Sequence, residues 1–183
     1  MTSDETEIAG FFAKYEPATA KLGKALRAKL RDRLPGLLEL VYVYENQNSL
    51  VFSYSPTEAG ADGVCGIAVY PTQVNLFLAG GPQLSKSDPK GLLQGAGKSV
   101  RHVVLSSVAD FDREEIEALI AAAVKLTKVR LDPNVKGAVV IKAAAQKKRA
   151  LRAKKTVKKA VKAPTAAKPA KPAPKRTIAK TRR

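Results

Sequence analysis

The chain has 183 residues, with 33 Lys/Arg against 16 Asp/Glu, which gives a formal net charge of +17 at pH 7. This length suits one domain with an appendage, and the single cysteine, Cys65, excludes an intrachain disulfide and a cysteine-based metal cluster. The acidic N-terminus does not have the order of a signal peptide, and no apolar run approaches the ~20 residues needed to cross a bilayer, so we expect a soluble cytoplasmic protein that does not bind membranes.

The net charge is concentrated at the end of the chain. Residues 1–135 hold 15 Lys/Arg and all 16 Asp/Glu, whereas residues 136–183 hold 18 Lys/Arg and no acid. A near-neutral segment of this length can bury a core, but a segment rich in Lys, Arg, Ala and Pro cannot offset the entropy lost on ordering. We therefore predict a domain at 1–134 and a basic tail at 135–183, partly helical to about 162 and disordered beyond.

Two helices are expected at the start of the chain. Apolar residues from Ile8 to Tyr15 repeat at helical spacing, and Asp4 is expected to cap this first helix. A second helix is expected over about 18–34, with leucines facing inward. Its charged residues, Arg27 among them, are expected to face solvent.

Five strand-like runs follow, separated by turn residues. The order of helices, then strands, then a helix predicts an α+β fold: a roughly five-stranded, mostly antiparallel sheet with helices at both ends. The expected strands are Leu38–Tyr44, Leu50–Ser55, Val64–Tyr70, Val74–Ala79 and Val100–Ser106.

The helix after the last strand is expected to begin at Asp112. Asp112 and Glu115 have the spacing of a capping box, and Phe111 and Ile116 have that of a hydrophobic staple. The apolar residues that follow share one helical face, which must pack against the sheet.

Several of these segments resemble the YdhG-like family of uncharacterised domains. The matching features are a Ser-Pro-Thr-Glu loop at 55–58, Ala-Val-Tyr-Pro at 68–71, a Leu-Gln-Gly-x-Gly-Lys turn at 93–98 and an Ala-Asp-x-Asp helix start at 109–112, all within about 15–128. The resemblance implies a small α+β fold that is similar in places to frataxin. It also implies a role in iron handling, because some members are considered iron chaperones.

No constellation of residues in the sequence indicates an enzyme. Gly95–Ser99 is similar to the end of a phosphate-binding loop, but it leads into a strand rather than a helix, so we interpret it as a structural turn. His102 is the only histidine and alternates with valines, which favours a packed residue. Cys65 lies in an apolar run, where a buried role is expected. We therefore predict no catalytic residue and no resident cofactor.

Two groups of residues each allow two interpretations. Asp110, Asp112 and Glu114 either offset the partial positive charge of a helix N-terminus or offer carboxylate oxygens to iron, which is the alternative function and the one cofactor considered. Aromatic residues on neighbouring strands either fill the core and pair across strands or line a pocket or a surface for stacking bases. These aromatics are Tyr42, Tyr44, Phe52, Tyr54 and Tyr70.

The basic tail gives the clearest functional prediction. Its composition is similar to that of linker-histone tails, and each phosphate that such a tail contacts releases a counterion, which drives sequence-independent binding. We predict a non-enzymatic protein held on nucleic acid, with DNA favoured over RNA, and associated with the nucleoid if the source is prokaryotic. The predicted nucleic-acid-binding residues are Lys147, Lys148, Arg149, Arg152, Lys154, Lys155, Lys158, Lys159, Lys162, Lys168, Lys171, Lys175, Arg176, Lys180, Arg182 and Arg183.

Overall fold

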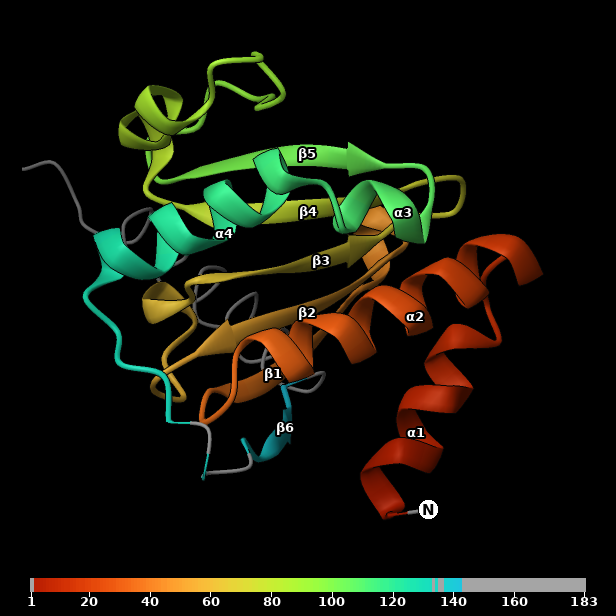
Figure 1. Ribbon diagram of the computed structural model, residues 1–183. Helices are drawn as coiled ribbons and strands as arrows, with labels where there is room; N and C mark the ends of the chain where they lie inside the picture. Colours follow the sequence, from red (N-terminus) through yellow and green to blue (C-terminus); the bar gives the residue numbers. More distant parts are fainter. Residues whose placement is uncertain (1, 133, 135–136, 143–183) are drawn as a thin grey trace, which may run out of the picture. The chain divides into compact units, whose positions relative to one another are not determined.

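The computed structural model describes residues 2–132, 134 and 137–142 of the chain. Over these residues the fold is α+β, with one mixed sheet and helices before and after most of its strands (Figure 1). The predicted fold class is therefore confirmed.

The five predicted strands are present, close to the expected bounds. Each is antiparallel to the next, and a sixth strand completes the sheet in the order β5-β4-β3-β2-β1-β6. The strands are β1 (Leu38–Tyr44), β2 (Ser49–Ser55), β3 (Cys65–Val69), β4 (Val74–Ala79), β5 (Val100–Leu105) and β6 (Val139–Ile141). The helices are α1 (Ser3–Phe12), α2 (Pro17–Arg33), α3 (Val108–Phe111) and α4 (Glu114–Thr127), with 3₁₀ turns η1 (Glu45–Gln47), η2 (Gly60–Asp62) and η3 (Gly81–Ser87).

The sixth strand corrects the predicted domain boundary at 134. β6 pairs in parallel with β1, where the Glu39 amide donates to Ala138 O (2.8 Å) and the Lys142 amide donates to Val41 O (2.7 Å). Gly137 lies so close to the backbone of Leu37 that a Cβ there would clash with the Leu37 carbonyl. The folded part therefore continues to at least Lys142, and Val139–Ile141 is strand where a partly helical tail was expected. The rest of the predicted tail lies outside the described residues.

The helix after β5 begins differently from the prediction. Ser107 and Asp110 form a capping box: Ser107 Oγ accepts from the Asp110 amide (3.2 Å), and Asp110 Oδ2 accepts from the Ser107 amide (2.9 Å). These bonds satisfy free backbone amides one turn earlier than expected, so α3 forms first and ends at Phe111. α4 then begins at Glu114, with Arg113 as an N-cap that makes no side-chain bond. The capping box predicted at Asp112 and Glu115 is wrong.

The first two helices lie close to their predicted positions. The N-cap of α1 is Thr2 rather than the expected Asp4, because Thr2 Oγ1 accepts from the Glu5 amide (3.4 Å). Pro17 is the first residue of α2, where its missing N–H costs nothing.

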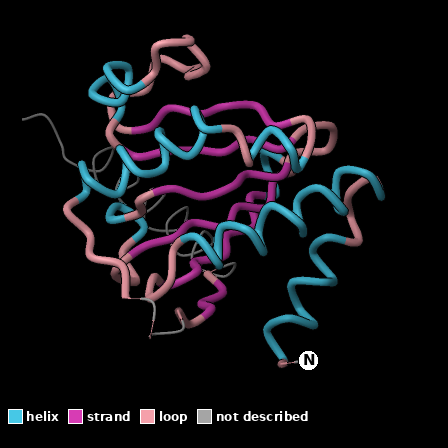
Figure 2. The backbone as a smooth tube through the Cα atoms, viewed as in Figure 1, coloured by secondary structure: helices cyan, strands magenta, loops and turns pink. Residues whose placement is uncertain are grey.

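The core lies between the helices and one face of the sheet. Figures 1 and 2 show α2 and α4 over the same face, where α2 packs on β3 and β4 and α4 packs on β4 and β3. Alternate residues of each strand point to this face, and registered neighbours form continuous apolar rows. One such row runs Val41, Phe52, Ile67, Leu76, Val103 from β1 to β5, with every member buried.

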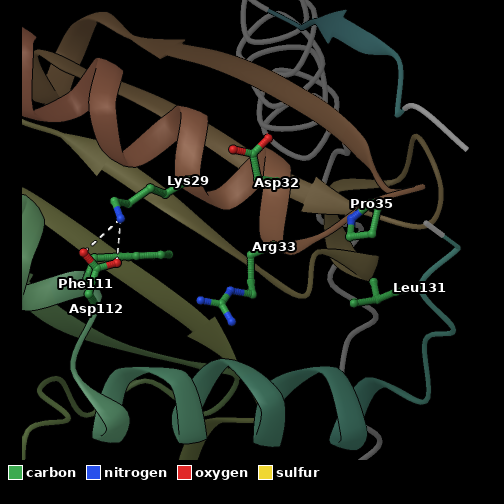
Figure 3. Close-up of a pocket in the computed structure, with 7 residues that line it drawn as sticks. All are labelled: Lys29, Asp32, Arg33, Pro35, Phe111, Asp112 and Leu131. Carbon is green, nitrogen blue, oxygen red and sulfur yellow. Dashed lines mark hydrogen bonds and ion pairs between the residues drawn. The ribbon is translucent and has the colours of Figure 1, made fainter. Parts of the chain in front are cut away.

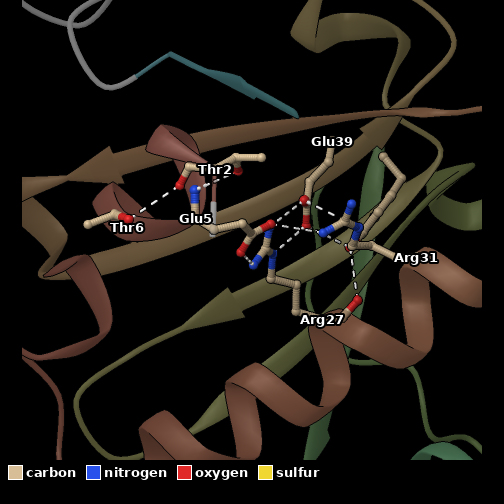
Figure 4. Close-up of polar contacts among 7 residues, drawn as sticks. Thr2, Glu5, Thr6, Arg27, Arg31 and Glu39 are labelled. Carbon is tan, nitrogen blue, oxygen red and sulfur yellow. Dashed lines mark hydrogen bonds and ion pairs between the residues drawn. The ribbon is translucent and has the colours of Figure 1, made fainter. Parts of the chain in front are cut away.

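A buried ion-pair network joins α1, α2 and the sheet at the edge of this core (Figure 4). Arg27 is only 8% exposed and Glu39, on the helix-facing side of β1, only 2%. Arg27 donates from Nε to Glu39 Oε1 (2.8 Å) and from Nη2 to Glu39 Oε2 (2.7 Å), and its Nη1 donates to Glu5 Oε2 (2.6 Å). The Tyr54 hydroxyl donates to Glu39 Oε1 (2.9 Å). The expectation that Arg27 faces solvent is therefore wrong.

The charges of this network stabilise one another. Burial lowers the pKa of the Arg27 guanidinium, but hydrogen bonds to Glu5 and Glu39 outweigh burial, so the pKa is raised. The Arg27 hydrogen bond also lowers the pKa of Glu5. The guanidinium lies over the Phe52 ring, with Arg27 Cζ 5.2 Å from the ring centroid. Arg27 and Glu5 therefore remain ionised near neutral pH.

We expect Arg27→Met to lower the free energy of unfolding by about 3–5 kcal/mol, because it removes the paired cation from the buried Glu39 carboxylate and leaves only the Tyr54 hydroxyl and the more distant Arg31 beside it. The double variant Arg27→Met/Glu39→Met should recover most of this loss, since it removes both buried charges. Urea unfolding of the full chain measures both effects. Lys21→Met, on an exposed position of the same helix, is the matched control, and an Arg27→Met variant as stable as this control would contradict the assignment.

Candidate functional site

All sixteen predicted nucleic-acid-binding residues, from Lys147 to Arg183, lie outside the described residues. The structure therefore neither gathers nor separates them. The part of the chain that it does describe places the other predicted site residues.

The three predicted iron ligands do not converge. Asp110 Oδ2 is used by the Ser106 and Ser107 amides (2.9 Å each), and Asp112 pairs with Lys29. Glu114 lies in the first turn of α4. Among the described residues, no group of three or more His, Cys, Asp or Glu side chains is arranged to hold a metal ion. The carboxylates whose partners are seen are engaged in capping and pairing, so the geometry does not favour the iron alternative.

The acids near this helix start differ in what stabilises their ionised form. The Ser106 amide, followed by the Ser107 amide and hydroxyl, lowers the pKa of Asp110 below its usual value. A hydrogen bond from Lys90 lowers the pKa of Glu115 to about 2. Both residues therefore act as fixed negative charges.

A groove between α2 and α3 contains paired charges (Figure 3). Lys29 Nζ donates to Asp112 Oδ1 (2.6 Å) and Oδ2 (2.9 Å), and Arg33 pairs with Glu117. Because both cations are paired with carboxylates, the groove offers no excess positive charge to a ligand. Its lining residues are Lys29, Asp32, Arg33, Pro35, Phe111, Asp112 and Leu131.

Cys65 has the buried role that the sequence predicted, whereas the side chain of His102, predicted to be packed, is only partly buried. Cys65 is fully buried, and burial raises the pKa of its thiol to about 12, so no reactive thiolate forms at neutral pH. His102 lies partly buried on β5, where its amide donates to Gln94 O (3.1 Å) and its carbonyl accepts from the Gln94 amide (2.7 Å). This pair closes the Gly95–Ser99 turn, which leads into a strand as expected and not into a helix.

The strand aromatics divide between the two faces of the sheet. Phe52 and Tyr54 point to the helix side and are buried in the core, and Phe52 stacks on Phe12 with 5.5 Å between ring centroids. Tyr42 and Tyr44 point to the opposite face and are partly exposed, with their ring centroids 6.0 Å apart. The core interpretation is therefore confirmed for the first pair only.

The face of the sheet opposite the helices, here called the second face, has a small-residue floor between aromatic borders. No helix of the described residues covers it (Figures 1 and 2). By register, β2 and β3 contribute Ser53, Gly66 and Ala68 to the floor, and β4 and β5 contribute the neighbouring pair Phe77 and His102. Tyr42 and Tyr44 border the floor on the β1 side.

The η2 turn borders the second face near Tyr42. A Cβ on Gly60 would lie 2.7 Å from the Tyr42 hydroxyl oxygen, so the backbone of the turn lies directly against the tip of this ring.

Two buried polar atoms on the second face have no hydrogen-bond partner among the described residues. They are Ser49 Oγ and Asn75 Oδ1, in side chains that are 1% and 7% exposed. Such orphaned groups are rare, because each costs the desolvation of a hydrogen-bonding atom. This face was not predicted from the sequence, although the alternation of Tyr42 and Tyr44 places both rings on one side of β1 and could have indicated it.

Comparisons with protein-family models, with curated proteins and with solved structures found no match to this chain. The resemblance to the YdhG-like family therefore stays a prediction. Within the part of the chain that the structure describes, no helix has the length and apolar character required to span a membrane.

We expect Asp110→Ala to lower the free energy of unfolding at pH 7 by about 1 kcal/mol, the usual effect of losing a helix cap. Because the folded-state pKa of Asp110 is lowered, its contribution is present above the unfolded-state pKa and is lost as the pH falls through the folded-state pKa. Urea unfolding at about pH 7 and about pH 2.5 should therefore show a gap between the wild type and the variant that narrows in acid.

The matched control for this prediction is Asp112→Ala, which removes only the partly exposed pair with Lys29. That loss should be at most about 1 kcal/mol. An Asp110→Ala gap that is equally wide at both pH values would contradict the capping role.

Proposed function

We propose that this protein is a non-enzymatic, YdhG-like α+β domain that residues 143–183 hold on nucleic acid, independently of sequence. One observation carries the proposal: residues 143–183 contain sixteen Lys/Arg and no Asp/Glu, whereas residues 1–142 contain 17 Lys/Arg and 16 Asp/Glu. Nearly all of the excess positive charge therefore belongs to the last 41 residues.

The folded part uses many of its cations internally. Its ion pairs join helices to one another, to loops and to the sheet, so the charge of these cations is already balanced by nearby carboxylates. The cations in these pairs are Arg27, Lys29, Arg31, Arg33, Lys90, Arg113 and Lys142. This pairing supports residues 143–183 as the main source of attraction for nucleic acid.

The chemistry of residues 143–183 favours contacts with phosphates over contacts with bases. Their Lys and Arg side chains release condensed counterions when they neutralise phosphates, and this release does not depend on the base sequence. They contain no aromatic residue, so they supply no ring for stacking on bases. The likeness of their composition to linker-histone tails favours DNA over RNA as the partner.

We expect the affinity of the full chain for duplex DNA to fall steeply with salt. If about six phosphates are contacted, the affinity should fall roughly a thousandfold between 50 and 200 mM salt. Replacing the sixteen Lys/Arg of residues 143–183 by Gln should remove most of the binding and most of the salt dependence. Fluorescence anisotropy of a labelled duplex across a salt series measures both effects.

The matched control replaces every Lys of residues 143–183 by Arg, which keeps the charge and should keep the salt slope. Substitution is preferred to truncation after 134, because that truncation would remove β6 from the sheet. Equal affinity of the Gln variant and the wild type would remove residues 143–183 from the mechanism.

A further inference from the structure

The second face of the sheet carries aromatic rings that the core does not use. Tyr42 and Tyr44 lie on one side of the floor, with ring centroids 6.0 Å apart and 32° between ring planes. Phe77 and His102 are direct cross-strand neighbours on the other side. All four side chains are partly exposed, and planar rings presented on a sheet are a common surface for stacking unpaired bases.

The polar atoms of this face also favour a ligand with hydrogen-bonding edges. Asn75 Oδ1 can accept a hydrogen bond, and Ser49 Oγ can accept or donate one. Neither atom has a partner among the described residues, although both side chains are buried. The amino and imino groups of a nucleobase supply donors of the kind that an amide oxygen accepts.

The charge of this face excludes some other ligand classes. By register, the strand residues that share it include no Asp or Glu, since the one carboxylate of the strands, Glu39, points to the helix side. The strand residues of this face therefore offer no carboxylate to a metal ion or an organic cation. A neutral nucleobase, on a strand whose phosphates are bound by another part of the chain, fits this face better than a cation does.

The chain itself supplies the cations for those phosphates. β6 ends beside β1, where the Lys142 amide donates to Val41 O (2.7 Å), and Tyr42 is the next residue of β1. The sixteen Lys/Arg of residues 143–183 follow directly in the sequence. Lys142, the last described residue, lies beside β1, and these sixteen cations come after it in the sequence.

We propose that the second face binds unpaired bases of single-stranded nucleic acid, which stack on Tyr42, Tyr44 and Phe77. The edges of the bases hydrogen-bond to Asn75 and Ser49. This inference rests on the proposed function only for the phosphate contacts, which residues 143–183 provide. Bases inside a duplex are already stacked and paired, so the face distinguishes single strands from duplexes.

The test uses the full chain and two probes of the same sequence, a single strand and a duplex of about 15 nucleotides, close to the upper end of site sizes on such surfaces. The double variant Tyr42→Leu/Phe77→Leu keeps apolar bulk but removes two rings. We expect its single-strand affinity to fall about tenfold for each ring removed, and its duplex affinity to stay the same.

Two further variants separate stacking from folding. Tyr42→Phe keeps the ring and should keep single-strand affinity, whereas Tyr15→Leu removes a partly buried tyrosine outside the sheet and should leave both affinities unchanged. The chain has five tyrosines and no tryptophan, so quenching of its intrinsic fluorescence by the single strand reports on tyrosine. The quenching should weaken in Tyr42→Leu/Phe77→Leu and persist in Tyr15→Leu.

Each outcome supports or overturns this inference. A loss confined to the single strand supports it. The inference is overturned if the ring variant loses affinity equally for both probes, or loses affinity for neither. It is also overturned if only self-association changes, which would indicate that a second copy of the chain binds this face. Replacing the Lys and Arg of residues 143–183 by Gln should lower the affinity for both probes. If that variant instead binds the duplex with wild-type affinity, while the ring variant still has a lowered affinity for the single strand, the proposed function fails and the second-face inference stands.

Discussion

The helix layer of this fold depends on one buried negative charge. Glu39 lies on the core side of β1, at 2% exposure, where an ionised carboxylate is tolerated only with a partner at hydrogen-bond distance. Arg27 of α2 supplies that partner, and Glu5 of α1 and Tyr54 of β2 complete the bonding of the two groups. A shift of either helix along the sheet would separate these charges, so the network fixes both helix positions.

The strands were predictable from the sequence because each obeys a local rule. Alternating apolar residues between turn signals marked β1 to β5 almost to the residue, and the same alternation assigns Val41, Phe52 and Ile67 to one buried row. Arg27 was not predictable in this way. Its partners are 12 and 22 residues away in the sequence, and helical periodicity assigns a lone charged residue at the edge of an apolar face to solvent.

The missed β6 and the misplaced helix start have different physical causes. β6 has only three residues and pairs in parallel with a strand about a hundred residues earlier, while its local composition merges with the basic segment that follows. At the helix start, two capping sequences compete within six residues. The bonds between Ser107 and Asp110 prevail, and they allow Phe111 to be buried in the core.

The two faces of the sheet differ in whether their buried polar groups have hydrogen-bond or ion-pair partners. On the helix side, the rows of apolar residues are covered and the buried charges have partners. On the second face, Ser49 and Asn75 have unmet hydrogen-bonding capacity beside rings that the core does not need. Contacts with phosphates position a protein on nucleic acid, whereas contacts with bases discriminate between targets. With nearly all excess charge in residues 143–183, the proposed function and the proposed base-binding face assign affinity and discrimination to separate parts of this chain. Each part could then change without disturbing the buried network that holds the fold.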